Sequence, residues 1–203
     1  RKRYPVLYMH DGQNLFDDRT SFAGEWGVDE TLDELARTKK LEVIVVGIEN
    51  GGEKRINELK PWAHEKYGPG EADDYLRFIV EVVKPWADAQ YRTRPDRAHT
   101  GIMGSSLGGL TSWYAAFKYP QVFGRIGVFS PSYWIAPQAY DLEPTQQLPK
   151  GTRMYQSIGG REGGDMEHEE TVAKAVRMEA QMRHDQPGLS LRAVVRPQAE
   201  HNE

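Results

Sequence analysis

The sequence contains no cysteine among its 203 residues. That absence excludes a disulfide framework, a metal site built from thiolates and a cysteine nucleophile, but it does not assign a compartment. Long apolar runs are also missing, since no stretch approaches the roughly 20 residues of a membrane-spanning helix. No leader segment is visible either, but the sequence opens directly on the strand-like "RKRYPVLYM", so we infer no compartment from this.

The sequence also lacks a large excess of charge of either sign. It has 26 Lys and Arg against 30 Asp and Glu, which gives a formal net charge of −4, and the two signs are interspersed. Neither nucleic acid nor an anionic membrane is therefore expected as a partner. His64-Glu65 and His168-Glu169 lack the second histidine of H-E-x-x-H, and no EF-hand pattern occurs. We expect no metal and no other cofactor, and composition fixes no oligomeric state.

Short apolar segments rich in β-branched residues alternate with segments of helical periodicity. The predicted strands are residues 4–10, 43–48, 99–104, 125–130, 152–160 and 189–197. The predicted helices are residues 29–38, 70–91, 106–120 and 166–185, with Pro85 expected to kink the end of the second. This alternation predicts an α/β fold, a mainly parallel sheet with helices on both faces. No repeat or linker divides the chain, so we expect one domain over residues 1–203.

A Pro-rich and aromatic segment follows the strand at 125–130. It reads "SPSYWIAPQAYDLEPTQQLPKG", residues 130–151. Its length and composition predict a loop or lid over the carboxyl edge of the sheet.

The segment Gly104-Ser105-Ser106-Leu107-Gly108 is a G-x-S-x-G pattern between a predicted strand and a predicted helix. In this setting the pattern predicts a nucleophile elbow, a strained turn that exposes a serine hydroxyl above the sheet. Ser106 is the candidate, because centring the pattern on Ser105 would put Met103 and Leu107 where glycines are needed. The pentapeptide alone is weak evidence, since chance produces it in roughly one such chain in ten. A phosphate-binding loop is disfavoured because no lysine follows the glycines.

A serine nucleophile needs a base and an acid, and in this architecture they follow it in the order acid, then histidine. His201 follows the last predicted strand in the polar "QAEHNE" and fits the base. Glu162 and Asp165 both follow the strand at 152–160. Glu162 is favoured as the acid because it lies nearer the strand end, which leaves Asp165 to cap the next helix.

An oxyanion hole requires a second backbone N–H besides that of Leu107. The tight polar loop after the first strand, in "YMHDGQNLF", provides it. The amide of Gln13 is the main candidate and that of Gly12 the alternative.

With these residues assembled, the chain resembles the putative-esterase family of α/β hydrolases. That family includes enterochelin-type esterases, feruloyl and acetyl-xylan carbohydrate esterases, and the antigen 85 mycolyltransferases. The resemblance rests on motifs that occur in order along nearly the whole chain. They are "YPVLYMHDGQNLFD", "VIVVGIEN" with "RINELKP", "YLRFIVEVVKPWADAQYRT", "GIMGSSLGGL", "FGRIGVFSPSYW", "IGGREG" and "EHNE".

The resemblance implies an α/β-hydrolase fold and a serine carboxylic ester hydrolase that works through an acyl-enzyme. Its site would consist of Ser106, an acid from "GGREGGD", His201, and the amides of Gln13 and Leu107. The family's usual architecture also implies that two strands precede this chain and that a helix follows the histidine.

The implied substrate is a small-molecule or carbohydrate ester, such as a siderophore. Arg55 and Glu58 lie in the family's segment near the acyl pocket, where they either line the site or pair with each other as a surface ion pair. Trp134 is expected to wall the cleft. Two alternatives stay open at this point: an acyltransferase that uses the same triad, and a non-catalytic carbohydrate-binding protein on the same fold.

Overall fold

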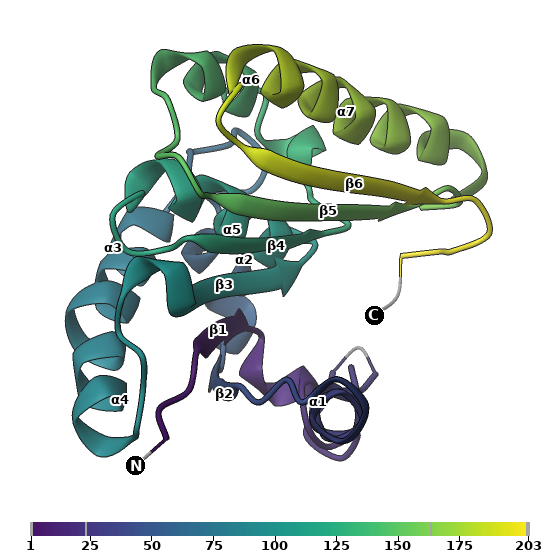
Figure 1. Cartoon of the computed structure of the whole chain (residues 1–203). Helices are drawn as coiled ribbons and strands as arrows, with labels where there is room; N and C mark the ends of the chain where they lie inside the picture. Colours follow the sequence, from purple (N-terminus) through teal and green to yellow (C-terminus); the bar gives the residue numbers. More distant parts are fainter. Residues whose placement is uncertain (1, 23, 163, 202–203) are drawn as a thin grey trace.

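The computed structural model describes residues 2–22, 24–162 and 164–201, and it contains one parallel sheet in this part of the chain (Figure 1). The strands run in the order β2-β1-β3-β4-β5-β6, and every neighbouring pair is parallel. Their bounds are β1 Val6–His10, β2 Ile44–Ile48, β3 Thr100–Ser105, β4 Arg125–Phe129, β5 Arg153–Gly159 and β6 Ser190–Arg196. The carboxyl ends of all these strands therefore meet at a single edge.

Helices occupy the connections between the strands. The longer ones are α1 Val28–Lys39, α3 Ala72–Phe78, α4 Lys84–Gln90, α5 Leu107–Lys118 and α7 Gly164–Asp185. Shorter ones are α2 Arg55–Glu58 and α6 Ala139–Leu142, with 3₁₀ turns η1 Gly12–Asn14, η2 Gly52–Lys54, η4 Arg97–His99, η5 Tyr133–Ile135 and η6 Glu143–Thr145. In the described part of the chain, no helix is long and apolar enough to cross a membrane.

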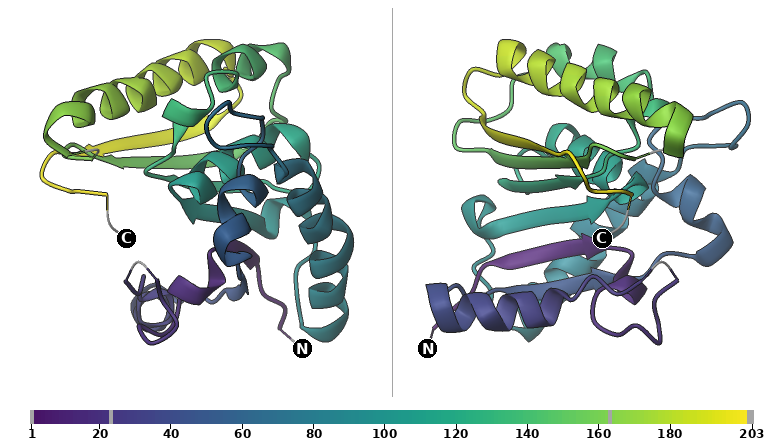
Figure 2. Two further views of the ribbon diagram at one scale, coloured as in Figure 1. Left: turned by 180° about the vertical axis from the view of Figure 1, so that it is seen from behind. Right: turned by 90° about the vertical axis from the view of Figure 1, so that its right-hand side faces the viewer.

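Two hydrophobic layers cover the two faces of the sheet. On β1, Val6 and Tyr8 pack into the larger core, which includes Trp113 of α5. Met9 faces the other way and packs with Val28 of α1. This alternation is the two-residue period of a strand buried on both faces. Figures 1 and 2 show α1 beside β1 and β2 at one end of the sheet, and α7 alongside β5 and β6 at the other. The predicted α/β-hydrolase architecture, mainly parallel with helices on both faces, is confirmed.

The segment 130–151 differs from the loop that the sequence predicts. It contains η5, α6 and η6, and Tyr133 is fully buried. The ring of Tyr133 packs edge-on against Trp113, with the centroids 5.9 Å apart, and its hydroxyl donates to Gln156 Oε1 at 3.0 Å. These contacts anchor the segment in the core, and Pro137 separates η5 from α6, so the segment is a run of short helical turns and not an irregular lid.

The predicted helix over residues 70–91 is also interrupted. A π-helical turn, η3 Ile79–Val83, separates α3 from α4, and Pro85 lies in the first turn of α4. Proline lacks an N–H and cannot complete the ladder of a helix interior. The wider π turn just before Pro85 accommodates it, so the irregularity lies upstream of the proline and not at the end of the helix.

Close backbone packing joins α5 to β4. A Cβ on Gly109, in the first turn of α5, would lie well inside van der Waals contact of the Phe129 carbonyl oxygen and 3.3 Å from the Gly104 carbonyl oxygen. Both obstacles are backbone atoms, which cannot rotate away as a side chain could. Glycine at this position therefore sets how near the helix comes to the strand.

We predict that Gly109→Ala destabilises the fold by about 1–3 kcal/mol in urea denaturation. The sign of the change in stability is informative, because replacing glycine by alanine at an exposed helix position would stabilise the fold by about 1 kcal/mol. Gly188→Ala is the matched control, since a Cβ there meets nothing within 4 Å. Equal stabilities for the two variants would contradict close packing at Gly109.

Candidate active site

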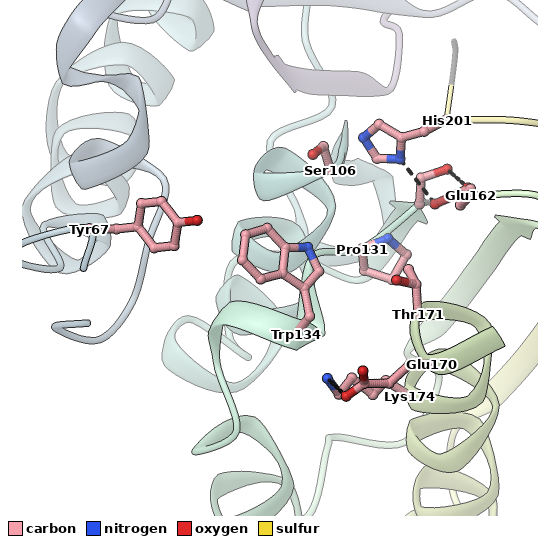
Figure 3. Close-up of a pocket in the computed structure, with 10 residues that line it drawn as sticks. Tyr67, Ser106, Pro131, Trp134, Glu162, Glu170, Thr171, Lys174 and His201 are labelled. Atoms are coloured by element: carbon pink, nitrogen blue, oxygen red, sulfur yellow. Dashed lines mark hydrogen bonds and ion pairs between the residues drawn. The ribbon is translucent and has the colours of Figure 1, made fainter. Parts of the chain in front are cut away.

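Loops that leave the carboxyl ends of four strands converge on one pocket of about 500 Å³ (Figure 3). Ser106 follows β3, Ser130 follows β4, Glu162 follows β5 and His201 follows β6. The pocket is lined by Tyr67, Ser106, Ser130, Pro131, Trp134, Glu162, Glu170, Thr171, Lys174 and His201. Four of the sequence-predicted site residues are therefore among the residues that line it: Ser106, Trp134, Glu162 and His201.

Ser106 has the backbone geometry of a strained turn. Its φ is 59° and its ψ is −119°, a region that L-residues rarely occupy and that costs about 1–3 kcal/mol. The surroundings enforce it: a Cβ on Gly104 would lie 2.9 Å from the Gly108 carbonyl carbon and 2.7 Å from the His10 ring. The Ser106 amide also donates to the Phe129 carbonyl at 3.0 Å. The chain therefore turns sharply from β3 into α5, and the Ser106 side chain reaches the pocket.

Glu162 is a buried carboxylate whose two oxygens both have hydrogen-bond donors. It is 1% exposed, and its Oε2 lies 3.0 Å from His201 Nδ1. Its Oε1 accepts from the Gly159 amide at 2.7 Å and from the Ser130 hydroxyl. Asp165, the alternative acid, lies in the first turn of α7, and its side chain is outside the described part of the structure. The Glu162–His201 contact is the one the favoured sequence hypothesis requires.

The imidazole of His201 lies between Glu162 and Ser106 in the view of Figure 3. Nδ1 faces a carboxylate, which accepts hydrogen bonds, so a neutral ring that donates to Glu162 has its proton on Nδ1 and Nε2 as its acceptor. A serine hydroxyl, a histidine acceptor and a buried carboxylate thus line one pocket. This arrangement can remove a proton from a serine as its oxygen attacks a carbonyl carbon.

Two further serines contact this set, and the sequence reasoning missed both. In the corner after β4, Ser130 donates to Glu162, and Ser132 Oγ lies 3.2 Å from Ser106 Oγ. Polar residues directly after a parallel strand belong to the same edge as the elbow, and that positional signal was available in "SPSYW".

The loop after β1 is held next to the elbow. A Cβ on Gly108 would lie 3.1 Å from His10 Cβ and 3.6 Å from Asp11 Oδ2. The side chain of Gln13 bonds the backbone of Asn50 in both directions, donating to its carbonyl at 2.9 Å and accepting from its amide at 3.1 Å. The first amides of a helical turn have no partner within it. The amides of Gln13 in η1 and of Leu107 in α5 lie in the first turn of their helices. This position suits the predicted role as oxyanion donors, which stays a prediction.

Gly12 and Glu58 have backbone neighbours that the sequence reasoning did not foresee. A Cβ on Gly12 would lie 2.9 Å from the Glu49 amide nitrogen, so glycine lets this loop pass close to the end of β2. Glu58 Oε2 accepts from the Gly51 amide at 2.8 Å.

Arg55 forms a bidentate ion pair with Asp11, and Asp11 has a left-handed backbone with φ 55° and ψ 50°. Nε donates to Oδ1 at 2.7 Å and a terminal nitrogen to Oδ2 at 2.8 Å, while Asn50 Nδ2 adds a bond to Oδ1 at 2.6 Å. Within the described chain, Arg55 and Glu58 are outside the set of residues that line the pocket. The network instead fixes the loop that carries Gln13.

His10 lies at the end of β1, behind the elbow, and is fully buried. Its Nδ1 is 2.8 Å from the Tyr75 hydroxyl. Burial lowers the pKa of His10 from 6.5 to about 4, the negative charge of Asp11 opposes this shift, and Arg55 adds to it. The ring is therefore neutral at neutral pH and supports the turn between Gly104 and Gly108.

The far wall of the pocket comes from elements that carry no catalytic pattern. Trp134 is 45% exposed, and its ring meets Tyr67 edge-on with the centroids 5.9 Å apart. From α7, Lys174 Nζ pairs with Glu170 Oε1 at 2.6 Å. Figure 3 shows Tyr67, Trp134 and this ion pair among the side chains that line the pocket. The wall thus presents aromatic surface and one nearly neutral polar pair.

Among the described residues, one cluster of acidic side chains has the spacing of a cation site. Carboxylate oxygens of Glu25, Asp29 and Glu30 lie within 4.8 Å of one another near the start of α1. Asp29 and Glu30 are exposed, and surface carboxylates often cluster without an ion. None of the three lines the pocket described above.

A sequence model of the family described as "Putative esterase" matches residues 1–190. The chain belongs to this family. The family predicted from the ordered motifs is confirmed.

Two curated relatives match most of this chain but a smaller share of their own length. The uncharacterized protein YbbA of Bacillus subtilis (strain 168) is 30% identical over 167 residues, which are 79% of this chain and 62% of the relative. The endo-1,4-beta-xylanase/feruloyl esterase of Xylanibacter ruminicola is 24% identical over 176 residues, which are 87% of this chain and 22% of the relative. This putative-esterase chain therefore spans less than two thirds of the length of either relative.

A solved structure supports the fold independently. The crystal structure of the enterobactin esterase FES from Shigella flexneri superposes with a TM-score of 0.77, covering 100% of this chain and 48% of that one. The two sequences are 18% identical, so this likeness of the putative-esterase chain establishes the fold alone.

We predict that the stability of this chain falls as the pH drops from about 6.5 towards 4. Between the unfolded pKa of 6.5 and the folded pKa of about 4, the unfolded chain binds the extra proton on His10. The free energy of unfolding should fall by up to about 1.4 kcal/mol per pH unit from this group. Urea denaturation across pH 5–7 measures the slope.

The slope should flatten in His10→Gln and persist in His184→Gln. Glutamine cannot take up a proton, while His184 is a control with an 88% exposed side chain. If His10→Gln retains the wild-type slope, His10 is not the group responsible.

Proposed function

We propose that this chain is a serine carboxylic ester hydrolase that acts through an acyl-enzyme. The observation that carries the proposal is one pocket that contains a serine in a strained elbow and a histidine bonded to a buried glutamate. Ser106 is the nucleophile, His201 the general base and Glu162 the acid that orients it. Membership of the putative esterase family supports the same class of reaction.

Acylation begins when Ser106 Oγ attacks the ester carbonyl carbon. His201 Nε2 takes the serine proton, while Glu162 stabilises the imidazolium through Nδ1. The carbonyl electron pair moves onto its oxygen, where the amides of Gln13 and Leu107 donate to it. His201 then returns the proton to the leaving alcohol, and an acyl group remains on Ser106.

Deacylation uses the same groups with water as the nucleophile. His201 removes a proton from water as its oxygen attacks the acyl carbon, and afterwards protonates Ser106 Oγ as the acid departs. No step in this cycle consumes a cofactor.

The proposed substrate is a small ester of a siderophore, carbohydrate or similar alcohol. Trp134 and Tyr67 present aromatic surface at the pocket, which can stack on a planar or pyranose ring. Two similar proteins have names that agree with this substrate class: a curated relative named as a feruloyl esterase and a structural neighbour named as an enterobactin esterase.

We predict that Ser106→Ala lowers kcat for p-nitrophenyl acetate by about 10⁴–10⁶-fold, because the nucleophile is lost. An alkyl fluorophosphonate probe should label wild-type protein and not this variant. Ser105→Ala is the matched control, since it removes the adjacent serine and should keep both activity and labelling. A folded wild-type protein that neither hydrolyses the ester nor takes the label would contradict the proposal.

We predict that Glu162→Gln lowers kcat by about 10²–10⁴-fold, because an amide no longer stabilises the imidazolium or the required tautomer. Asp165→Asn should leave kcat unchanged in the same assay. A reversed pattern would identify Asp165 as the acid.

A further inference from the structure

Ser132 lies against the nucleophile and has no role in the mechanism above. Its hydroxyl oxygen is 3.2 Å from Ser106 Oγ. Ser132 as a whole is buried, with 3% of its surface exposed. Only polar atoms within reach can satisfy a buried hydroxyl, and the nucleophile's oxygen is one of them.

The backbone around Ser132 is tied directly to the elbow. The Ser132 amide donates to the Ser106 carbonyl at 3.1 Å, and the Ser106 amide donates to the Phe129 carbonyl at 3.0 Å. Two residues join Phe129 to Ser132. Ser130 has a positive φ of 43°, and Pro131 has a restricted backbone. These constraints fix the Ser132 hydroxyl relative to the nucleophile.

The residue that follows anchors the corner in the core. Tyr133 is 1% exposed, its hydroxyl donates to Gln156, and its ring packs on Trp113 of α5. Trp113 belongs to the helix that begins at the elbow. The corner and the elbow are thus held to the same helix, so the contact between the two serines is built into the fold.

Resting on the proposed function, we propose that Ser132 is a positioning residue that donates a hydrogen bond to Ser106 Oγ and orients it for acylation. The two hydroxyls have one proton each. For Ser106 to give its proton to His201, its oxygen must accept, not donate, at Ser132. The bond from Ser132 then selects the side-chain rotamer whose proton is free for the base.

Orientation of the nucleophile by Ser132 belongs to the acylation half of the cycle. During attack, the bond between Ser106 Oγ and the acyl carbon forms, the serine proton moves to His201, and Ser132 retains its own proton. In the acyl-enzyme, Ser106 Oγ is an ester oxygen, which accepts hydrogen bonds weakly. Water is the nucleophile in deacylation, so Ser132 orients no nucleophile there, and it contacts Ser106 Oγ only as the leaving oxygen that His201 protonates.

The test is the pre-steady-state burst with p-nitrophenyl acetate, which separates acylation from deacylation. In Ser132→Ala, the burst rate should fall about 2- to 12-fold, the range expected for the loss of one hydrogen bond. The deacylation rate, measured on pre-formed acyl-enzyme, should fall by a smaller factor, because Ser106 Oγ is the leaving oxygen there and needs no orientation for attack. Labelling by the fluorophosphonate should slow by the same factor as the burst.

Two further variants separate positioning from packing. Ser112→Ala removes a buried hydroxyl that donates to the Gly108 carbonyl within α5, and both rates should stay at wild type. Ser132→Cys keeps nearly the same size with a weaker donor, and its burst rate should lie between those of Ser132→Ala and wild type.

A wild-type burst rate in Ser132→Ala would overturn the proposal. An equal fall in acylation and deacylation would also overturn it, because a general disturbance of the site slows both. Absence of a burst and of labelling in wild-type protein is a different result, since it rejects the serine mechanism itself and the role of Ser132 with it.

Discussion

The strained backbone of Ser106 is the constraint from which the rest of the site is arranged. Its φ of 59° persists because the glycines on either side of it leave no room to relax: Gly104 is packed against Gly108 and the His10 ring, and Gly109 against the Phe129 carbonyl. A strain of about 1–3 kcal/mol is tolerated when surrounding contacts over-determine the conformation. Here those contacts come from β1, β4 and α5 together, so the elbow is a property of the folded sheet and not of five residues alone.

The neighbouring loops take their positions from that turn. The corner after β4 bonds the elbow through the Ser132 amide and contacts Glu162 through Ser130. The loop after β1 is fixed by Asp11, whose side chain forms a bidentate pair with Arg55 and whose backbone is left-handed. This ion pair ties the loop to Arg55, which is far away in the sequence. Breaking the pair would leave a buried carboxylate without its partner, which is strongly destabilising. Short polar contacts therefore couple Ser106 and Glu162 through the corner after β4, and the loop that carries Gln13 is fixed beside them by Arg55 and Asn50.

The sequence predicts the parts of this site that follow from strand order. Ser106, Glu162 and His201 each lie within four residues of the end of a predicted strand, and parallel strands bring such residues to one edge. The Asp11–Arg55 pair was not predictable, since it joins residues 44 apart and "RINE" suggests an ion pair with Glu58 equally well. The segment 130–151 was predicted as a loop because its prolines conceal that Tyr133 reaches the core. Ser132 carries a positional signal, since it follows a predicted strand, but its contact with Ser106 depends on a distance that only the fold supplies.

The proposed catalytic residues and the residues of the opposite pocket wall belong to different kinds of element. The former lie at strand ends, where sheet register fixes the backbone to which they are attached. The latter, Tyr67, Trp134 and Lys174, come from a loop, a 3₁₀ turn and an outer helix. Substitutions at these three positions would reshape the wall without moving the sheet edge, because none of them contributes a ladder hydrogen bond. A fold organised in this way can keep one chemistry while the accepted ester changes, which explains why the sequence predicts a reaction class more sharply than a substrate.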